Sequence, residues 1–238
     1  MKIEIDLPSK LNNIKLKDYQ DFLEFIKTTE DQQVIQLKMI ELFCNFDSKA
    51  ISRIKATSLV DITNHINSIF EEERVLTKVF KMGNKEFGFM TNLEDMTLGE
   101  YIDLDNYLGD FNSIHKAMAV LYRPITKKKR AWFNRKEVQY SIEEYNGTSE
   151  TSELMRHMPL DIALGAHFFF VNLREELLKA TMDFLEQQIM MNQNKALTKQ
   201  QTLDKNGDGI AQSINLQMEM LKELKKLQNL TYTNALPI

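Results

Sequence analysis

The chain has 238 residues, of which 43% are hydrophobic, and a formal net charge of −4 at pH 7. This length is enough for one large or two small domains with an ordinary core, and the acidic balance argues against wholesale coating of nucleic acid while leaving room for a local basic patch. The single cysteine, Cys44, excludes an intramolecular disulfide and indicates a small buried side chain in a reducing compartment.

The composition favours helix over most of the chain. Only 8 Gly and 4 Pro interrupt it, and Leu, Lys, Glu, Gln, Met and Ile are plentiful. The longest apolar run, residues 162–171, is shorter than the roughly 20 residues that a membrane span needs. We therefore predict a mainly α protein with a multi-helix body, a small antiparallel β element and no membrane span.

The first elements predicted are a short strand and a helix pair. Residues 2–6 alternate between polar and apolar side chains as a strand does, and Pro8 ends the alternation. Apolar residues then recur at helical spacing over 16–26 and again over 34–43. We expect these two helices to pack against each other.

Capping signals predict where two further helices begin. Ser58 and Asp61 are spaced as a capping pair, so a helix is expected to start near Ser58. Thr97 and Glu100 have the same spacing, and Gly109 stands where the helix that they start is expected to end.

A β-hairpin is predicted near residues 77–90. Its apolar residues lie on either side of Gly83-Asn84, and glycine at the first turn position supplies the positive φ that a two-residue turn needs. A buried helix is expected over 113–122, and Pro124 is expected to end it. The basic stretch 127–136 then reads as an exposed loop that returns into a strand from residue 138.

The last third predicts a long helix and a separate amphipathic arm. The long helix begins after Pro159, and we place the domain boundary near residue 195, giving a body of 1–195 and an arm of 196–238. The arm either folds back on the long helix or binds another subunit. Its apolar face consists of Ile210, Ile214, Met218, Leu221, Leu224 and Leu227.

The stretch "LDKNGDGIAQSIN", residues 203–215, resembles the start of a calcium-binding loop. Such a loop closes with a bidentate Glu at its last position. Counted from Asp204, that position is Asn215, which offers one neutral oxygen. We therefore interpret the stretch as a hinge in which Gly207 and Gly209 redirect the chain, and we predict neither a metal nor a cofactor.

Two sets of titratable residues are candidates for catalytic or metal sites. The four histidines have neither the i, i+4 spacing nor the flanking Cys or Glu of a helix-borne zinc site, and His167 is expected to be a hydrogen-bonded core residue. We interpret the carboxylates as a solvated acidic face, with Glu100 explained by helix capping, and predict no catalytic residue. These carboxylates are Glu94, Asp95, Glu100, Asp103, Asp105 and Asp110.

The basic stretch is the strongest surface signal in the sequence. Clustered cations with interleaved aromatic residues suit a contact with a phosphate backbone or with a partner protein, and they equally suit a solvated loop whose aromatic side chains turn inward. The residues are Lys127, Lys128, Lys129, Arg130, Trp132, Phe133, Arg135 and Lys136.

Five segments together carry a resemblance to a known group of proteins. They are "FKMGNKEFGFMTNLEDMTLGEYIDLDNYL", "HKAMAVLYRPI", "YSIEEYNGT", "MPLDIALGAHFFFVNL" and "NGDGIAQSINLQMEMLKEL". In this order they resemble proteins of tailed bacteriophages, including crAss-like phages, that are encoded among the virion structural genes. The resemblance extends from about Thr77 onward, and its motifs carry no known chemistry.

This resemblance implies a non-enzymatic virion or assembly protein that contacts other phage structural proteins. The roles left open are a portal- or tail-associated component, a packaged cargo protein, and a tail assembly chaperone absent from the mature virion. A homo-oligomer or ring is expected for a component on the portal–tail axis. The expected location is the virion, after synthesis in the bacterial cytoplasm. The alternative function is binding of phage nucleic acid through residues 127–136.

Overall fold

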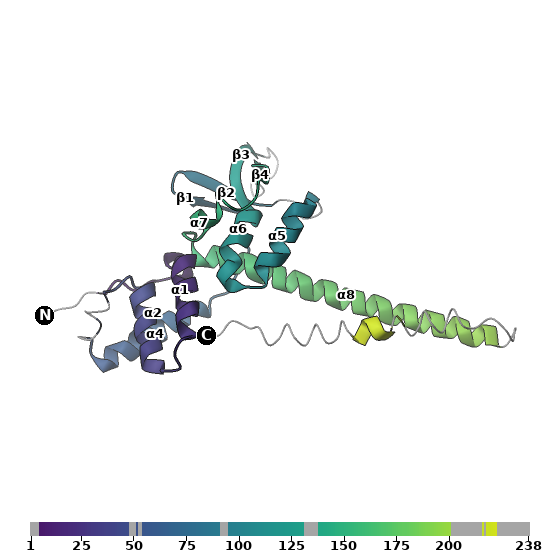
Figure 1. Ribbon diagram of the computed structural model, residues 1–238, viewed down its shortest axis with the longest axis horizontal. Helices are drawn as coiled ribbons and strands as arrows, with labels where there is room; N and C mark the ends of the chain where they lie inside the picture. Colours follow the sequence, from purple (N-terminus) through teal and green to yellow (C-terminus); the bar gives the residue numbers. More distant parts are fainter. Residues whose placement is uncertain are drawn as a thin grey trace. The chain divides into compact units, whose positions relative to one another are not determined.

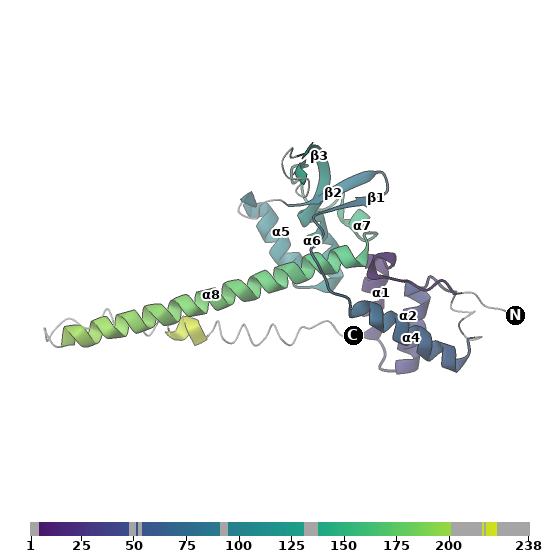
Figure 2. The same ribbon diagram turned by 180° about the vertical axis from the view of Figure 1, so that it is seen from behind.

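The computed structural model consists mainly of helices, with one small antiparallel sheet (Figures 1 and 2). The residues that the structure describes are 5–47, 51, 54–90, 95–130, 138–200, 216 and 218–222. The chain divides into two compact units, Met1–Phe169 and Phe170–Ile238. The prediction of a mainly α fold with a small β element is confirmed.

Helices dominate the chain before residue 71, whereas helices and strands alternate after it. The first part contains η1 (Leu11–Asn13), α1 (Leu16–Ile26), α2 (Gln32–Phe43) and α4 (Ala56–Phe70). The second part contains β1 (Val79–Met82), β2 (Lys85–Phe89), α5 (Leu98–Leu108), η3 (Phe111–Ser113), α6 (Ile114–Leu121), β3 (Tyr122–Arg130), β4 (Val138–Ile142), α7 (Ser152–Met155) and α8 (Leu160–Gln200).

An aromatic cluster holds the N-terminal helices together. The ring of Tyr19 on α1 lies 6.3 Å from Phe43 on α2 and 5.5 Å from Phe70 on α4, measured between ring centroids. Phe22 packs edge-on against Phe43 at 5.2 Å. Such pairs add to the free energy gained by burying the rings. The predicted packing of the first two helices is confirmed.

The predicted N-terminal strand is not observed over the residues of it that can be followed. Ile5 and Asp6 are not in a strand, and the rest of the predicted segment lies outside the described residues. The alternation of side chains predicts a strand only where a neighbouring strand offers hydrogen bonds. Among the described residues, the sheet consists of β1 to β4 and contains no N-terminal strand.

The two capping predictions have different outcomes. Thr97 and Glu100 form the predicted reciprocal cap of α5, with Thr97 N donating to Glu100 Oε2 at 2.7 Å, and Gly109 follows the end of the helix. The pair Ser58 and Asp61 is wrong as a cap, because α4 already begins at Ala56 and both residues lie inside it. Helix propagates readily backward through Ala56, the best helix former, without a capping side chain.

The sheet is fully antiparallel, in the order β1-β2-β3-β4. Met82 pairs with Lys85 across the predicted two-residue turn, and Gly83 has φ +59°, so the hairpin prediction is confirmed. On one sheet face Phe80 stacks on Phe87 and meets Tyr122 edge-on, since alternate residues of a strand share a face. In both views α6, whose residues are nearly all buried, lies beside the sheet (Figures 1 and 2).

Strand β3 corrects the prediction for the basic stretch. Helix α6 ends at Leu121, before Pro124, and the chain continues as a strand through Pro124 to Arg130, where we predict a loop. Proline lacks the N–H that a central strand needs. It is tolerated here because the pairing of β3 with β2 ends at Pro124, so beyond this residue β3 pairs only with β4.

Helix α8 confirms the predicted long helix after Pro159. Its first turns are buried, including Leu160, Leu164 and Ala166. The two compact units divide between Phe169 and Phe170, inside α8, whereas the helix runs unbroken through residue 195, where we place the domain boundary. The hinge predicted at 203–215 lies outside the described residues.

Gly165 provides a stability test of the contact between α8 and residues 75–76. A Cβ at position 165 would lie 2.4 Å from the carbonyl oxygen of Val75, and backbone cannot move aside as a side-chain tip can. We expect Gly165→Ala to lower the free energy of unfolding by about 1–3 kcal/mol in urea denaturation.

Gly99 is the matched control for this substitution. It also lies in a helix, but a Cβ at position 99 would meet nothing within 4 Å. Gly99→Ala should therefore raise the free energy of unfolding by about 0.5–1 kcal/mol, because alanine restricts the unfolded chain and favours helix. Equal effects of the two substitutions would contradict the close contact at Gly165.

Candidate functional site

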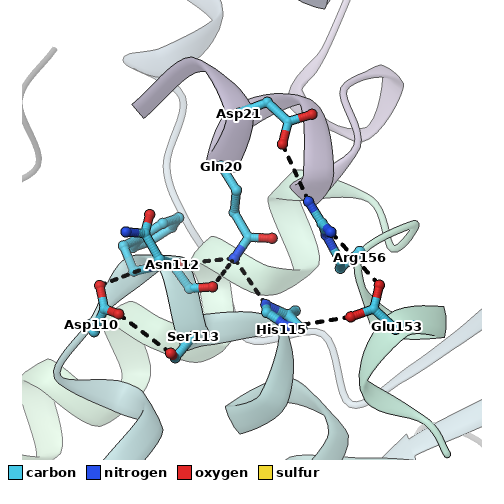
Figure 3. Close-up of polar contacts among 9 residues, drawn as sticks. Gln20, Asp21, Asp110, Asn112, Ser113, His115, Glu153 and Arg156 are labelled. Carbon is cyan, nitrogen blue, oxygen red and sulfur yellow. Dashed lines mark hydrogen bonds and ion pairs between the residues drawn. The ribbon is translucent and has the colours of Figure 1, made fainter. Parts of the chain in front are cut away.

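The most closely connected polar cluster of the described residues surrounds the buried side chains Gln20 and His115 (Figure 3). Gln20 Nε2 lies 3.0 Å from the carbonyl oxygen of Phe111, 2.8 Å from that of Asn112 and 3.1 Å from His115 Nδ1. Carbonyl oxygens only accept hydrogen bonds, so the amide nitrogen of Gln20 has to face them. Gln20 on α1 thus connects to both η3 and the start of α6.

His115 lies between Gln20 and Glu153. The amide of Gln20 has two hydrogens for three nearby acceptors, the carbonyl oxygens of Phe111 and Asn112 and the ring of His115, so this contact does not assign the ring hydrogen of His115 to one nitrogen. His115 Nε2 lies 4.0 Å from Glu153 Oε1 on α7. Burial lowers the pKa of His115, the cations Arg156 and Lys116 lower it further, and Glu153 opposes them. His115 is therefore neutral at pH 7.

Arg156 extends the cluster back to α1. In Figure 3 its guanidinium lies between Asp21 and Glu153, with Nη2 3.2 Å from Asp21 Oδ1 and Nη1 3.7 Å from Glu153 Oε2. The carbonyl oxygen of Arg156 also accepts a hydrogen bond of 2.8 Å from Lys17 N. Arg156 therefore connects the end of α7 to α1 through both its side chain and its backbone.

The contacts of this cluster join helices. Ser113 is the hydroxyl side chain nearest to His115 in sequence. Its hydroxyl donates a hydrogen bond of 3.3 Å to Oδ2 of Asp110, the residue that caps η3. A nucleophile is activated by a hydrogen bond to its base, and Ser113 directs its bond to Asp110 instead of His115. Sequence reasoning missed this cluster because Gln20 and His115 are 95 positions apart and share no motif.

His167 differs from the prediction of a hydrogen-bonded core residue. Its Nδ1 is buried and has no hydrogen-bond partner among the described residues. The ring packs edge-on against Phe111, with 5.6 Å between centroids, and against Phe168 at 6.0 Å. Aromatic neighbours supply packing and no acceptor, and burial lowers the pKa of His167.

The acidic residues do not form one solvated face, so that interpretation is corrected. Glu100 is only 3% exposed and its Oε1 lies 2.8 Å from Arg123 Nη2 on β3. Asp103 accepts a hydrogen bond from the hydroxyl of Tyr145. Asp110 caps η3 by accepting from Asn112 N at 3.1 Å. Each of these carboxylates on α5 and η3 therefore binds a different partner, and together they do not form one acidic face.

Of the remaining acidic residues, Asp95 and Asp105 are exposed, and Glu94 lies outside the described residues. Within the part of the chain that the structure describes, no group of three or more His, Cys, Asp or Glu side chains is arranged to hold a metal ion.

Strand geometry separates the residues of the basic stretch. Lys127 and Lys128 are consecutive in β3 and therefore point to opposite faces of the sheet. Lys128 Nζ lies 2.6 Å from Glu86 Oε2, and this hydrogen bond lowers the pKa of Glu86. Lys129 and Arg130 complete β3, whereas Trp132, Phe133, Arg135 and Lys136 lie outside the described residues.

An open depression beside the hairpin turn is lined by charges of both signs. It has a volume of about 680 Å³, and Lys81 and Lys85 face Glu86 and Glu143 around it. Equal numbers of cations and carboxylates give the depression no preference for an anion over a cation. It therefore does not identify a ligand class.

The predicted apolar face of the arm can be followed only in part. Met218 is exposed and Leu221 is half-buried in the helical residues 218–222. Ile210, Ile214, Leu224 and Leu227 lie outside the described residues, as does the calcium-like stretch. Whether the arm binds another subunit stays a prediction.

Comparisons with known proteins add no relative of this chain. No protein-family model, curated protein or solved structure matches it. None of the helices among the described residues is long and apolar enough to span a membrane. Function is therefore inferred from the residues themselves and from the resemblance of their sequence to phage proteins.

The lowered pKa of His115 predicts that acid destabilises the fold. The unfolded chain takes up a proton at the ordinary pKa of about 6.5, whereas the folded chain binds it only at lower pH. The free energy of unfolding should therefore fall as the pH drops below about 6.5. Urea denaturation between pH 7.5 and 5 measures this dependence.

Single substitutions distinguish the contribution of His115 to the pH dependence of stability from that of His167. His115→Asn keeps an acceptor for Gln20 but does not titrate, so it should flatten the pH dependence in part. His167→Asn should remove another part of the pH dependence, since burial lowers the pKa of His167 as well. An unchanged pH dependence in His115→Asn would show that His115 is not the titrating group.

Proposed function

We propose that this chain is a non-enzymatic structural or assembly protein of a tailed-phage particle, acting through apolar helix faces that bind other proteins. The resemblance of its sequence segments to phage virion proteins supplies the biological setting. The observation that carries the molecular mechanism is the set of large apolar side chains that the folded chain leaves exposed on its helices. Clustered exposed apolar residues mark protein interaction sites.

Helix α5 carries one such set. Leu98, Tyr101 and Ile102 are all exposed and lie three and four residues apart, so they share one helix face. The opposite face of α5 contains the buried residues Glu100 and Leu104. Helix α5 is therefore anchored on one side and presents an apolar strip on the other.

Helix α8 carries a second set in the other compact unit. Phe184, Met190 and Met191 are 59%, 63% and 55% exposed, although Met182, Leu185 and Ile189 on the same helix are buried. Leu216, Met218 and Met220 are exposed in the same unit. Methionine-rich apolar surfaces adapt to protein partners. This supports a role in protein–protein contact.

The location of the protein is tested by mass spectrometry of purified particles of the phage that encodes it. A virion component should be present in particles after density-gradient purification, at a constant ratio to the major capsid protein. A cytoplasmic host protein measured in the same fractions is the control for carry-over. Presence in infected cells together with absence from particles would contradict the virion role and support the tail assembly chaperone.

A second candidate function, nucleic-acid binding, is supported by lysines on the sheet that extend the predicted basic stretch. Lys81 and Lys85 on the β1–β2 hairpin are exposed, as are Lys127 and Lys128 on β3. Exposed cations bind phosphate backbones without regard to base sequence. The neighbouring Glu86 reduces this field, because it pairs with both Lys81 and Lys128.

Fluorescence anisotropy with a labelled single-stranded oligonucleotide tests this second function. Replacing Lys81, Lys85 and Lys127 by Ala should weaken binding by roughly tenfold or more at low salt, because fewer counterions are released. The matched control removes three exposed lysines elsewhere in the first unit, namely Lys10, Lys17 and Lys55. Equal loss in both variants, or no binding by the unchanged protein, would exclude the sheet as a nucleic-acid surface.

A further inference from the structure

Helix α8 has a mainly apolar line of residues besides the one that the chain buries. Positions 173, 177, 180, 184, 188, 191, 195 and 198 fall on one side of the helix, because each step is three or four residues. Of these, Phe184 and Met191 are exposed apolar side chains, and Ala180 is an exposed small one. We refer to this set of positions as the Phe184 line. It extends for about 40 Å along the helix at 1.5 Å per residue.

The Phe184 line is distinct from the line that the chain buries. Met182, Leu185 and Ile189 are buried within the folded chain, whereas Ala180, Phe184 and Met191 of the Phe184 line are exposed. A helix that is apolar on two sides has two surfaces to cover, and a two-sided helix of this kind is typical of bundles with more than two helices. One of the two surfaces of α8 is therefore available for a partner.

The charges along α8 indicate what that partner is. Residues 174–186 contain four carboxylates and two cations, a formal net charge of −2, whereas residues 187–200 contain only the cations Lys195 and Lys199, a formal net charge of +2. An identical helix running antiparallel brings the negative half of each copy against the positive half of the other. A parallel pair in register would instead place like charges together.

We propose that α8 binds α8 of a second copy of this chain, antiparallel, through the Phe184 line. With the two-fold axis between residues 187 and 188, Phe184 of one copy meets Met191 of the other, and a ring–thioether contact forms twice. In the same register, position 195 of one copy falls opposite Ala180 of the other. Glu176 and Asp183 stand about one turn to either side of Ala180, are exposed and carry the charge opposite to that of a lysine at position 195.

This inference deepens the proposed function, on which it rests, by naming the partner of one apolar face. Self-association and the virion role can each be rejected without rejecting the other. A monomeric protein found in purified particles would overturn self-association and leave the virion role intact. A dimeric protein absent from particles would overturn the virion role and leave self-association intact.

Sedimentation velocity of the full chain over a range of concentrations tests the proposal. The unchanged protein should be a dimer, and Phe184→Asp should raise the dissociation constant by on the order of a hundredfold, because each dimer loses two buried rings, each worth roughly tenfold. Val60→Asp is the matched control, since Val60 on α4 is 52% exposed and lies outside the Phe184 line. A monomer at all concentrations, or a dimer indifferent to Phe184→Asp, would overturn the proposal.

Single cysteines determine the orientation of the two helices. Gln187→Cys lies next to the two-fold axis and should form a disulfide-linked dimer on mild oxidation. Glu176→Cys should not, because its two copies are about 35 Å apart in the antiparallel pair, far beyond the roughly 7 Å that a disulfide spans. Efficient cross-linking at both positions indicates a parallel pair and contradicts the proposal. The natural Cys44 is buried and provides the background rate in the unsubstituted chain.

A charge exchange tests the ionic contacts independently of folding. Lys195→Glu should weaken the dimer, and adding Glu176→Lys and Asp183→Lys to it should restore the dissociation constant. Restoration by the triple variant requires that these residues face one another across the interface. Failure of the triple variant to recover any affinity would rule out the proposed register. If the protein is monomeric and Phe184→Asp lowers its melting temperature, then the C-terminal segment of the same chain covers the line.

Discussion

The first compact unit depends on backbone hydrogen bonds between the segment before α1 and the turn before α8. Leu16 N donates to the carbonyl oxygen of Met158 at 3.0 Å, and Leu160 N donates to that of Ile14 at 2.9 Å. All four residues are buried, so water does not compete for these bonds. They hold residues distant in sequence side by side and thereby place α1 against the elements that follow the sheet.

The polar cluster around His115 follows from this backbone pairing. Gln20 lies one turn into α1, and once the helix start is fixed its amide reaches the carbonyl oxygens of η3 and the ring of His115. Arg156 then pairs with Asp21 across the same junction. These contacts join α1 to η3, α6 and the end of α7, and sets of exposed apolar side chains lie on α5 and on α8.

Much of the fold was predictable from local sequence signals. The cap of α5 by Thr97 and Glu100 and the turn at Gly83 depend on residues within four positions of one another, so the local sequence was enough to predict their geometry. The helix start at Ser58 was mispredicted because an uncapped start at Ala56 competes at little cost in free energy. The helix does end before Pro124 as predicted, whereas residues 127–130 were mispredicted as a loop because β4 offers hydrogen bonds to them.

Composition, spacing and turn residues act over short distances, so the sequence was enough to predict a mainly helical chain, a hairpin and a long helix after Pro159. The folded structure was needed to show that the consecutive lysines of β3 point to opposite sheet faces, that Glu100 pairs with Arg123, and that Gln20 contacts the buried ring of His115. These outcomes depend on burial and on partners distant along the chain. Desolvation and pairing of charges have no signature in the local sequence.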